Sequence, residues 1–250
     1  MNTVSRKLLV ILVSAAVFLT GCAKKPQRPD PSSTVLGPST GGMIQADGGH
    51  VLMTTQAAGS LLANAVNNTG IIQAQTIQNV KGTIMLMGGM ETGVVNVGGT
   101  LDASAPAGGN GGFIETSAAH VKIARGVKVT TEAPQGKTGT WLIDPQDFTV
   151  GSAPGNNISG ATLSAQLVTN NITINTAGAG TGNGDIFVND AITWSASGAP
   201  TTLSLIADRN VEINAPVTAT QGNFSVCCGQ DINVNAAMNN TMPAKPCRKP

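Results

Sequence analysis

Short runs in which apolar and polar residues alternate recur along the chain between about residue 71 and residue 240. The clearest pair is 203–218 and 224–239, which align without a gap at a spacing of 21 residues. Alternation over four to six residues predicts a strand with one buried face, and the Gly, Asn and Asp residues between the runs predict turns. Apolar residues coincide in this alignment as follows: Leu203 with Phe224, Leu205 with Val226, Val211 with Ile232, Ile213 with Val234, and Val217 with Met238.

A unit of about 20 residues with two or three short strands cannot bury its apolar face alone, so neighbouring units must stack. The repeats therefore predict an all-β fold, a parallel β-solenoid with degenerate repeats of about 20 residues. The Asn that follows each inner pair is expected to form an amide ladder between coils. A β-sandwich is the alternative, although its usual Cys and Trp markers are missing. The inner pairs expected to stack are Ile186 and Val188, Val211 and Ile213, and Ile232 and Val234.

A helical pattern is almost missing from the chain beyond residue 22. Residues 56–66 come nearest to it, and one short helix is expected there. Four segments are therefore expected: a signal peptide at 1–21, a Pro-, Gly- and Ser-rich tether at 22–42, a β-helix shaft at 43–242 and a disordered tail at 243–250. Three prolines in the tail oppose a capping strand, so the last coil is expected to fray or to self-associate end to end with another molecule.

The first residues have the order of a bacterial signal peptide. A basic start precedes the apolar stretch 8–19, whose 12 residues are too few to cross a bilayer that needs roughly 20. The following Leu-Thr-Gly-Cys at 19–22 resembles the lipobox of bacterial lipoproteins, which implies lipidation of Cys22. Ala23 at the second mature position then implies sorting to the outer membrane of a Gram-negative bacterium. An ordinary secretory signal peptide is the alternative.

The composition restricts the possible partners. Only 11% of the residues are charged and 3% are aromatic, whereas about a quarter of a typical soluble domain is charged. The surface must therefore consist largely of Ser, Thr, Asn, Gln and Gly. Between residues 31 and 244 there are 6 basic and 12 acidic side chains. This acidic balance would repel a phosphate backbone, so we expect no nucleic-acid partner.

Candidate chemistry is sparse, and we assign no catalytic, cofactor-binding or metal-binding residue. Asp144 and Asp147 enclose Pro-Gln, a pattern more typical of a turn than of paired carboxylates. His50 and His120 stand alone and are expected at the surface. The acidic residues weighed for catalysis are Asp102, Glu115, Asp144, Asp147, Asp185 and Asp190.

The cysteines do not form a ligand set. Cys227 and Cys228 are adjacent, so on a strand they point to opposite faces and cannot readily share one metal ion. In an oxidising compartment one of them can pair with Cys247. Cys22 is assigned to the lipid.

Three segments resemble the filamentous haemagglutinin family: GGFIETSAAHVKI at 111–123, GTWLIDPQDF at 139–148 and NGDIFVNDA at 183–191. The likeness extends from about residue 43 to residue 240. Members are large bacterial exoproteins secreted through two-partner systems, and the resemblance implies a right-handed β-helix shaft that mediates adhesion. The family's secretion domain, with its Asn-Pro-Asn-type motifs, is missing and the lipoprotein leader stands in its place. We therefore expect a truncated member, an internal fragment of such an adhesin joined to another export signal.

Two functions follow from these patterns. The leading hypothesis is a non-enzymatic, surface-associated adhesin that attaches to host-cell glycans or proteins through flat, Thr- and Asn-rich faces. The alternative is a carbohydrate-active β-helix enzyme of the cell envelope. That enzyme would need two carboxylates about 5 to 9.5 Å apart beside an aromatic platform, and Trp141 and Trp194 are the only tryptophans.

Overall fold

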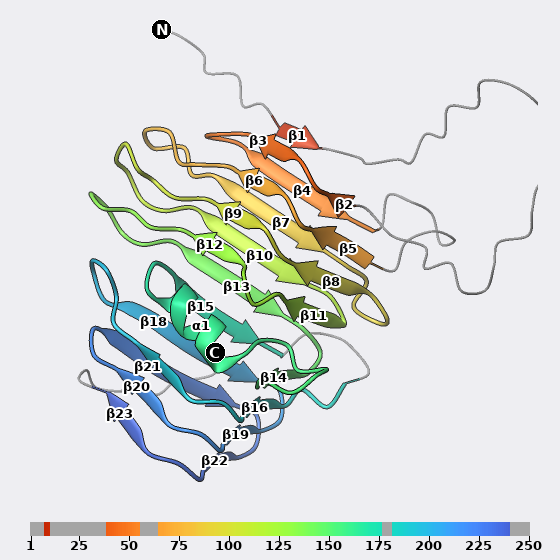
Figure 1. The fold of residues 1–250 in the computed structure, drawn as a ribbon, viewed down its shortest axis with the longest axis vertical. Helices are drawn as coiled ribbons and strands as arrows, with labels where there is room; N and C mark the ends of the chain where they lie inside the picture. Colours follow the sequence, from red (N-terminus) through yellow and green to blue (C-terminus); the bar gives the residue numbers. More distant parts are fainter. Residues whose placement is uncertain (1–7, 11–38, 56–64, 177–181, 241–250) are drawn as a thin grey trace, which may run out of the picture.

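The computed structural model describes residues 8–10, 39–55, 65–176 and 182–240. Within them, the regular structure is twenty-three short strands and one helix, so the expectation of an all-β chain with almost no helix is confirmed. All pairings between these strands are parallel. Figure 1 shows the strands stacked in chain order along the longest axis.

The strands form five sheets, because each pass of the chain adds one strand to each of several sheets. Sheet I runs through the whole stack, sheets II and III belong to the amino-terminal part, and sheets IV and V belong to the carboxy-terminal part. Sheet I contains β1 (Leu8–Val10), β4 (His50–Thr54), β7 (Thr83–Met87), β10 (Phe113–Ser117), β13 (Thr140–Asp144), β15 (Asn171–Asn175), β18 (Thr201–Ala207) and β21 (Gly222–Cys228).

The four shorter sheets have three or four strands each. Sheet II contains β2 (Ser39–Thr40), β5 (Ala65–Asn68), β8 (Val94–Val97) and β11 (His120–Ile123), and sheet III contains β3 (Met43–Gln45), β6 (Ile71–Gln73), β9 (Thr100–Asp102) and β12 (Lys128–Thr130). Sheet IV contains β14 (Phe148–Val150), β16 (Ile186–Val188), β19 (Val211–Ile213) and β22 (Ile232–Val234), and sheet V contains β17 (Ile192–Trp194), β20 (Val217–Ala219) and β23 (Met238–Asn240).

The core consists of columns of inward side chains that rise from strand to strand. Each fully buried aliphatic or aromatic side chain contributes roughly 1.5 to 3 kcal/mol. Thr116 interrupts a neighbouring column, where its hydroxyl accepts a hydrogen bond from Trp141 Nε1 at 3.1 Å. One column of sheet I, whose members are at most 5% exposed, contains Val51, Ile84, Ile114, Trp141, Ile172, Leu203 and Phe224.

The predicted alignment of the last passes is confirmed in every strand. Leu203 pairs with Phe224, and Val217 pairs with Met238. The three expected inner pairs also stack, with Ile186, Val211 and Ile232 in one column of sheet IV and Val188, Ile213 and Val234 in the next.

The repeat length of about 20 residues is wrong for most of the stack. Hydrogen-bonded positions on successive strands are 21 residues apart at Asn214 and Asn235 but 29 apart at Asn67 and Asn96. Asn171 and Thr202 are 31 apart. The additional residues lie in the turns, where they do not disturb the strand register.

The predicted amide ladder is confirmed in sheet IV. Asn214 Nδ2 donates to Asn189 Oδ1 at 2.9 Å, and Asn235 Nδ2 donates to Asn214 Oδ1 at 2.8 Å. The similar run that ends at Asn175 belongs to β15 instead, where it pairs with β18 in sheet I. An apolar-x-apolar-Asn run therefore identifies a strand but does not identify its sheet.

The helix lies where the sequence did not predict it. Residues 65 and 66, at the end of the expected helix 56–66, belong to β5, and 56–64 lie outside the described residues. The observed helix is α1 (Gly160–Leu167), and Ser159 caps it because its hydroxyl oxygen accepts a hydrogen bond from Thr162 N at 3.2 Å. Leu163 and Leu167, one helical turn apart, are buried.

The segment 151–170 replaces strands at the middle of the stack, where sheets II and III end (Figure 1). At the edge of β11, Ile123 N donates to Asn157 O at 2.8 Å. At the edge of β12, Val129 N donates to Gln166 Oε1 at 2.9 Å, and Asn170 Nδ2 donates to Val129 O at 2.9 Å. These groups satisfy backbone atoms that would otherwise need another strand.

Several predictions concern residues outside the described ranges. They include Cys22 with most of the predicted leader and tether, and Cys247 with the tail 243–250. Among the described residues, no helix has the length and apolar character needed to cross a bilayer.

Candidate functional site

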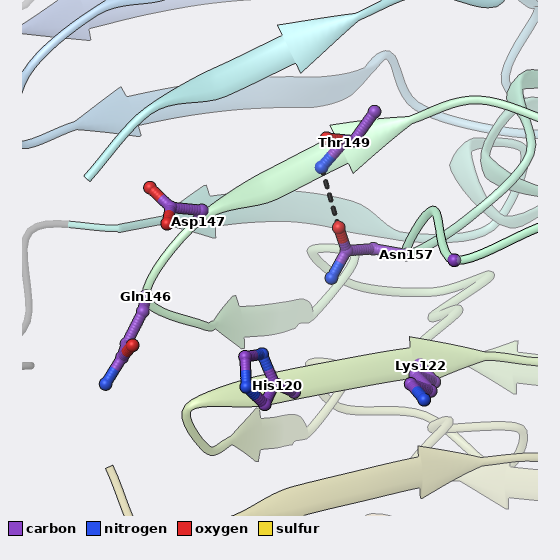
Figure 2. A pocket seen from close by; sticks show the side chains of 7 residues that line it. His120, Lys122, Gln146, Asp147, Thr149 and Asn157 are labelled. Carbon is purple, nitrogen blue, oxygen red and sulfur yellow. Dashed lines mark hydrogen bonds between the residues drawn. The ribbon is translucent and has the colours of Figure 1, made fainter. Parts of the chain in front are cut away.

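A hollow of about 190 Å³ lies beside β11, and we call it the His120 hollow. Figure 2 shows its labelled side chains, which come from β11, from β14 with the turn before it, and from the loop 151–158. Its lining residues are His120, Lys122, Gln146, Asp147, Thr149, Gly155 and Asn157.

Strand alternation determines which side chains line this hollow. Val121 is buried, so its neighbours His120 and Lys122 are exposed on the opposite face of β11. On β14, Thr149 is outward between the buried Phe148 and Val150. The surface position expected for His120 is therefore confirmed.

Two polar side chains of the hollow, Asn157 and Gln146, are held by hydrogen bonds to the backbone. Asn157 Oδ1 accepts a hydrogen bond from Thr149 N at 2.7 Å, while its Nδ2 donates to Val121 O at 2.8 Å, so this side chain connects β14 to β11. Gln146 Nε2 donates to the carbonyl oxygens of Met90 and Glu91. These bonds keep the hollow in one shape.

Asp147 is the carboxylate of the hollow, and it organises a neighbouring turn. Its Oδ1 accepts a hydrogen bond from Asp185 N at 3.0 Å, and its Oδ2 accepts one from Asn183 N at 3.3 Å. Both oxygens are thus occupied by backbone amides rather than directed at His120. The hollow presents imidazole, ammonium and hydroxyl groups to a polar ligand, without a prepared acid-base pair.

The turn expected at 144–147 is confirmed, because Asp144 ends β13 and a bend precedes β14. The residue that approaches Asp144 is instead Glu115 on the adjacent strand β10, where Ser117 pairs with Asp144. Burial, followed by repulsion from Glu115, raises the pKa of Asp144 to about 6. Its Oδ1 is buried and has no hydrogen-bond partner among the described residues. Sequence reasoning missed this neighbourhood because the repeat spacing in this part of the chain was not recognised.

The other weighed acids hold turns and corners in place. Asp102 Oδ2 accepts a hydrogen bond from Gln75 Nε2 at 2.7 Å. Asp185 forms a salt bridge with Arg209, and hydrogen bonds from the guanidinium hold the pKa of Asp185 below its usual value. Asp190 accepts a hydrogen bond from Gly160 N at 3.1 Å, at the start of α1.

Both tryptophans belong to the core. Trp141 and Trp194 are at most 3% exposed, and Trp194 Nε1 donates to Thr201 Oγ1 at 3.1 Å. A Cβ on Gly222 would collide with the indole of Trp194, so the missing side chain makes room for this ring. Neither tryptophan lines the His120 hollow.

The remaining candidates lie apart from the hollow. His50 is exposed at the start of β4. Cys228 points to the core face of β21, where it pairs with the buried Ala207. Cys227 points to the opposite face and pairs with Ile206, although it is also buried. The two side chains therefore have the expected opposite orientations. The described residues hold no group of three or more His, Cys, Asp or Glu that could bind a metal ion.

A second surface feature is the part of the outer side of β15, β18 and β21 that precedes Ile206 and Cys227, and we call it the polar face. Its side chains are short, half-buried and aligned from strand to strand by the parallel register. The Thr, Ser and Asn side chains here agree with the polar surface that the composition predicts. It contains Asn171, Thr173, Thr202, Ser204, Asn223 and Ser225.

The fold and these surfaces define an all-β protein of stacked parallel sheets with polar outer faces. Comparison with protein-family models, curated proteins and solved structures gives no match to this chain.

The unusual environment of Asp144 predicts a pH-dependent stability. Its folded pKa of about 6 lies above the reference value of 3.8, so this group lowers the free energy of unfolding as pH rises from about 4 to 6. We expect Asp144→Asn to be more stable than the wild type at pH 7.5, by roughly 1 kcal/mol after allowing for solvent screening. The two should be nearly equal at pH 4. Urea unfolding at both pH values measures this, with exposed Glu91→Gln as the control for lost charge, and an unaltered or lower stability of Asp144→Asn at pH 7.5 contradicts it.

Proposed function

We propose that this chain is a non-enzymatic, adhesin-like protein of the filamentous haemagglutinin type, which attaches to host or neighbouring-cell surfaces. The polar face carries this proposal. Its six Asn, Thr and Ser side chains present hydroxyl and amide groups at regular strand spacing, which suits hydrogen bonding to glycans or to polar protein surfaces.

We also propose that the five sheets wind as a right-handed parallel β-helix. The parallel pairing of every named strand, the buried columns and the Asn ladder support this architecture. The resemblance of residues 111–123, 139–148 and 183–191 to the haemagglutinin family supports the right-handed form.

The enzymatic alternative takes second place for a physical reason. A carbohydrate-active site of the expected kind combines paired carboxylates with an aromatic platform. The two tryptophans are buried in the core, and Asp147 in the His120 hollow is occupied by backbone amides. A binding role therefore fits the described surface better than catalysis.

The proposed location is the outer membrane or cell surface of a Gram-negative bacterium, with the membrane reached through a lipid on Cys22. Two or more acyl chains are enough for a stable anchor, since each buried CH₂ contributes about 0.8 kcal/mol. The lipobox-like residues 19–22 support this proposal.

Self-association through the carboxy-terminal side of the stack is a further part of the proposal. Ile232, Val234 and Met238 occupy inward positions but are 46%, 45% and 46% exposed. The paired positions Val211 and Ile213 are fully buried, because strands lie on both sides of β19. A second copy of the chain would bury this apolar surface and pair the strand edges.

The adhesion proposal predicts that blocking the polar face abolishes attachment. Ser204→Trp places a large outward side chain at its centre, and we expect at least a tenfold loss of binding to cultured epithelial cells and to a mammalian glycan array. Thr218→Trp, outward on β20, is the matched control and should bind normally. Equal binding by Ser204→Trp and the wild type would sink the assignment of this face.

Lipid attachment predicts that Cys22→Ser loses the label when cells grow with a labelled fatty acid. Cys228→Ser, which keeps the lipobox-like cysteine, should retain it. Undiminished labelling of Cys22→Ser would show that Cys22 is not the attachment site.

The self-association proposal predicts a concentration-dependent oligomer of the Cys22→Ser form at micromolar concentration under reducing conditions. Adding Val234→Asp should leave a monomer, because a charge would be buried in the contact. The control Asn239→Asp adds the same charge at an outward position of the neighbouring strand β23, where Asn239 pairs with Thr218. Sedimentation velocity measures both, and a monomer at every concentration without Val234→Asp rules out the contact.

A further inference from the structure

A second hollow, of about 260 Å³, lies where the chain enters three neighbouring strands of sheet I, and we call it the two-lysine hollow. The residues before β7, β10 and β13 form it, so it is built by three successive passes of the chain. Its lining residues are Lys81, Asn110, Gly111, Gly112, Phe113, Lys137, Thr138, Gly139 and Thr140.

Glycines let the backbones of successive passes approach closely beside this hollow. A Cβ on Gly112 would collide with the carbonyl oxygen of Gly82, and a Cβ on Gly139 would collide with that of Gly112. A Cβ on Gly111 would likewise meet Thr131 O. Because the backbones of successive passes lie so close together here, a side chain has no room at these three positions.

The charge of the lining is positive. Lys81 and Lys137 are exposed and come from passes on either side of the β10 strand. The strands β7 and β13, which follow Lys81 and Lys137, lie on either side of β10 and are therefore separated by roughly 10 Å. None of the described residues that line the hollow is Asp or Glu. By contrast, acidic side chains outnumber basic ones between residues 31 and 244. An anion is therefore attracted to this place more than to its surroundings.

An aromatic ring and an amide complete the hollow. Phe113 is the outward first residue of β10 and is half-buried between the smaller Thr83 and Thr140 of the neighbouring strands. Asn110 Oδ1 accepts a hydrogen bond from Lys137 N at 2.9 Å, which fixes the amide group at the rim. A partly exposed aromatic ring beside hydrogen-bonding groups suits the apolar face and the hydroxyl groups of a sugar.

We propose that the two-lysine hollow binds a sugar residue that carries one negative charge, a carboxylate or a sulfate, within a larger glycan. The sugar ring packs on Phe113, and the anionic group lies between Lys81 and Lys137. This inference rests on the proposed function and deepens it, because it gives the adhesin a site for acidic glycans separate from the polar face.

The test compares three small ligands that share lactose: 3′-sialyllactose, 3′-sulfolactose and lactose itself. Calorimetric titration of the full chain in detergent should give at least fivefold tighter binding for an anionic ligand than for lactose. The preference should fall at 0.5 M salt, because exposed charges are screened. Binding of the carboxylated or of the sulfated ligand, or of both, supports the proposal and identifies which anion is preferred.

Variants locate the binding in the hollow. Lys81→Gln and Lys137→Gln should each lower the affinity for the anionic ligand about three- to fivefold, which is the contribution expected of one exposed charge pair. The lactose titration should be unaffected by either variant. Lys122→Gln in the His120 hollow is the matched control and should bind normally. All three changes are at exposed positions, so they test binding rather than folding.

Equal affinity for lactose and the anionic ligands would overturn the proposal, as would unaltered binding by both lysine variants. The outcome is separable from that of the adhesion proposal. If Ser204→Trp loses cell attachment while glycan binding does not depend on the lysines, the polar face is supported as the attachment surface. The two-lysine hollow is then rejected as a glycan site. If glycan binding depends on the lysines while Ser204→Trp attaches to cells normally, the two-lysine hollow is supported as a glycan site. The polar face is then rejected as the attachment surface.

Discussion

Parallel pairing of each strand with its counterpart in the next pass is the interaction on which the rest of this structure depends. Side chains alternate between two faces, so a slip of one residue would move the inward column of Ile84, Ile114 and Trp141 into water. The same register determines which residues point outward. The alignment of Thr173 with Ser204 and Ser225 on the polar face is therefore a consequence of packing on the opposite side of the sheet.

One concave surface arises where this regular pairing is interrupted. Sheets II and III end at β11 and β12, and exposed strand edges there would leave backbone groups unpaired. Asn157, Gln166 and Asn170 supply those hydrogen bonds from the segment 151–170. The His120 hollow lies against this segment, so the groups that complete a strand edge also shape a concave polar surface.

The sequence was sufficient for the register of the last passes, because the turns around Val211 and Ile232 keep a constant length and the apolar positions align without gaps. It was insufficient where turns differ in length, so the approach of Asp144 to Glu115 was not recognised. The helix α1 was missed since only Leu163 and Leu167 mark its buried side, over eight residues. The two-lysine hollow brings together residues from three passes, whose proximity becomes evident only once the strands are paired.

A rigid stack of this kind suits weak contacts repeated over a surface. Thr, Ser and Asn have short side chains, and they lose less conformational entropy on binding than Lys or Gln would. Their regular spacing is preformed, so little of the interaction energy is spent on ordering the protein. Each hydrogen bond exchanged with water contributes only about 0.5 to 1.5 kcal/mol. Strong attachment through such a face must therefore come from many simultaneous contacts, whereas the proposed anion site between two lysines would select one chemical group.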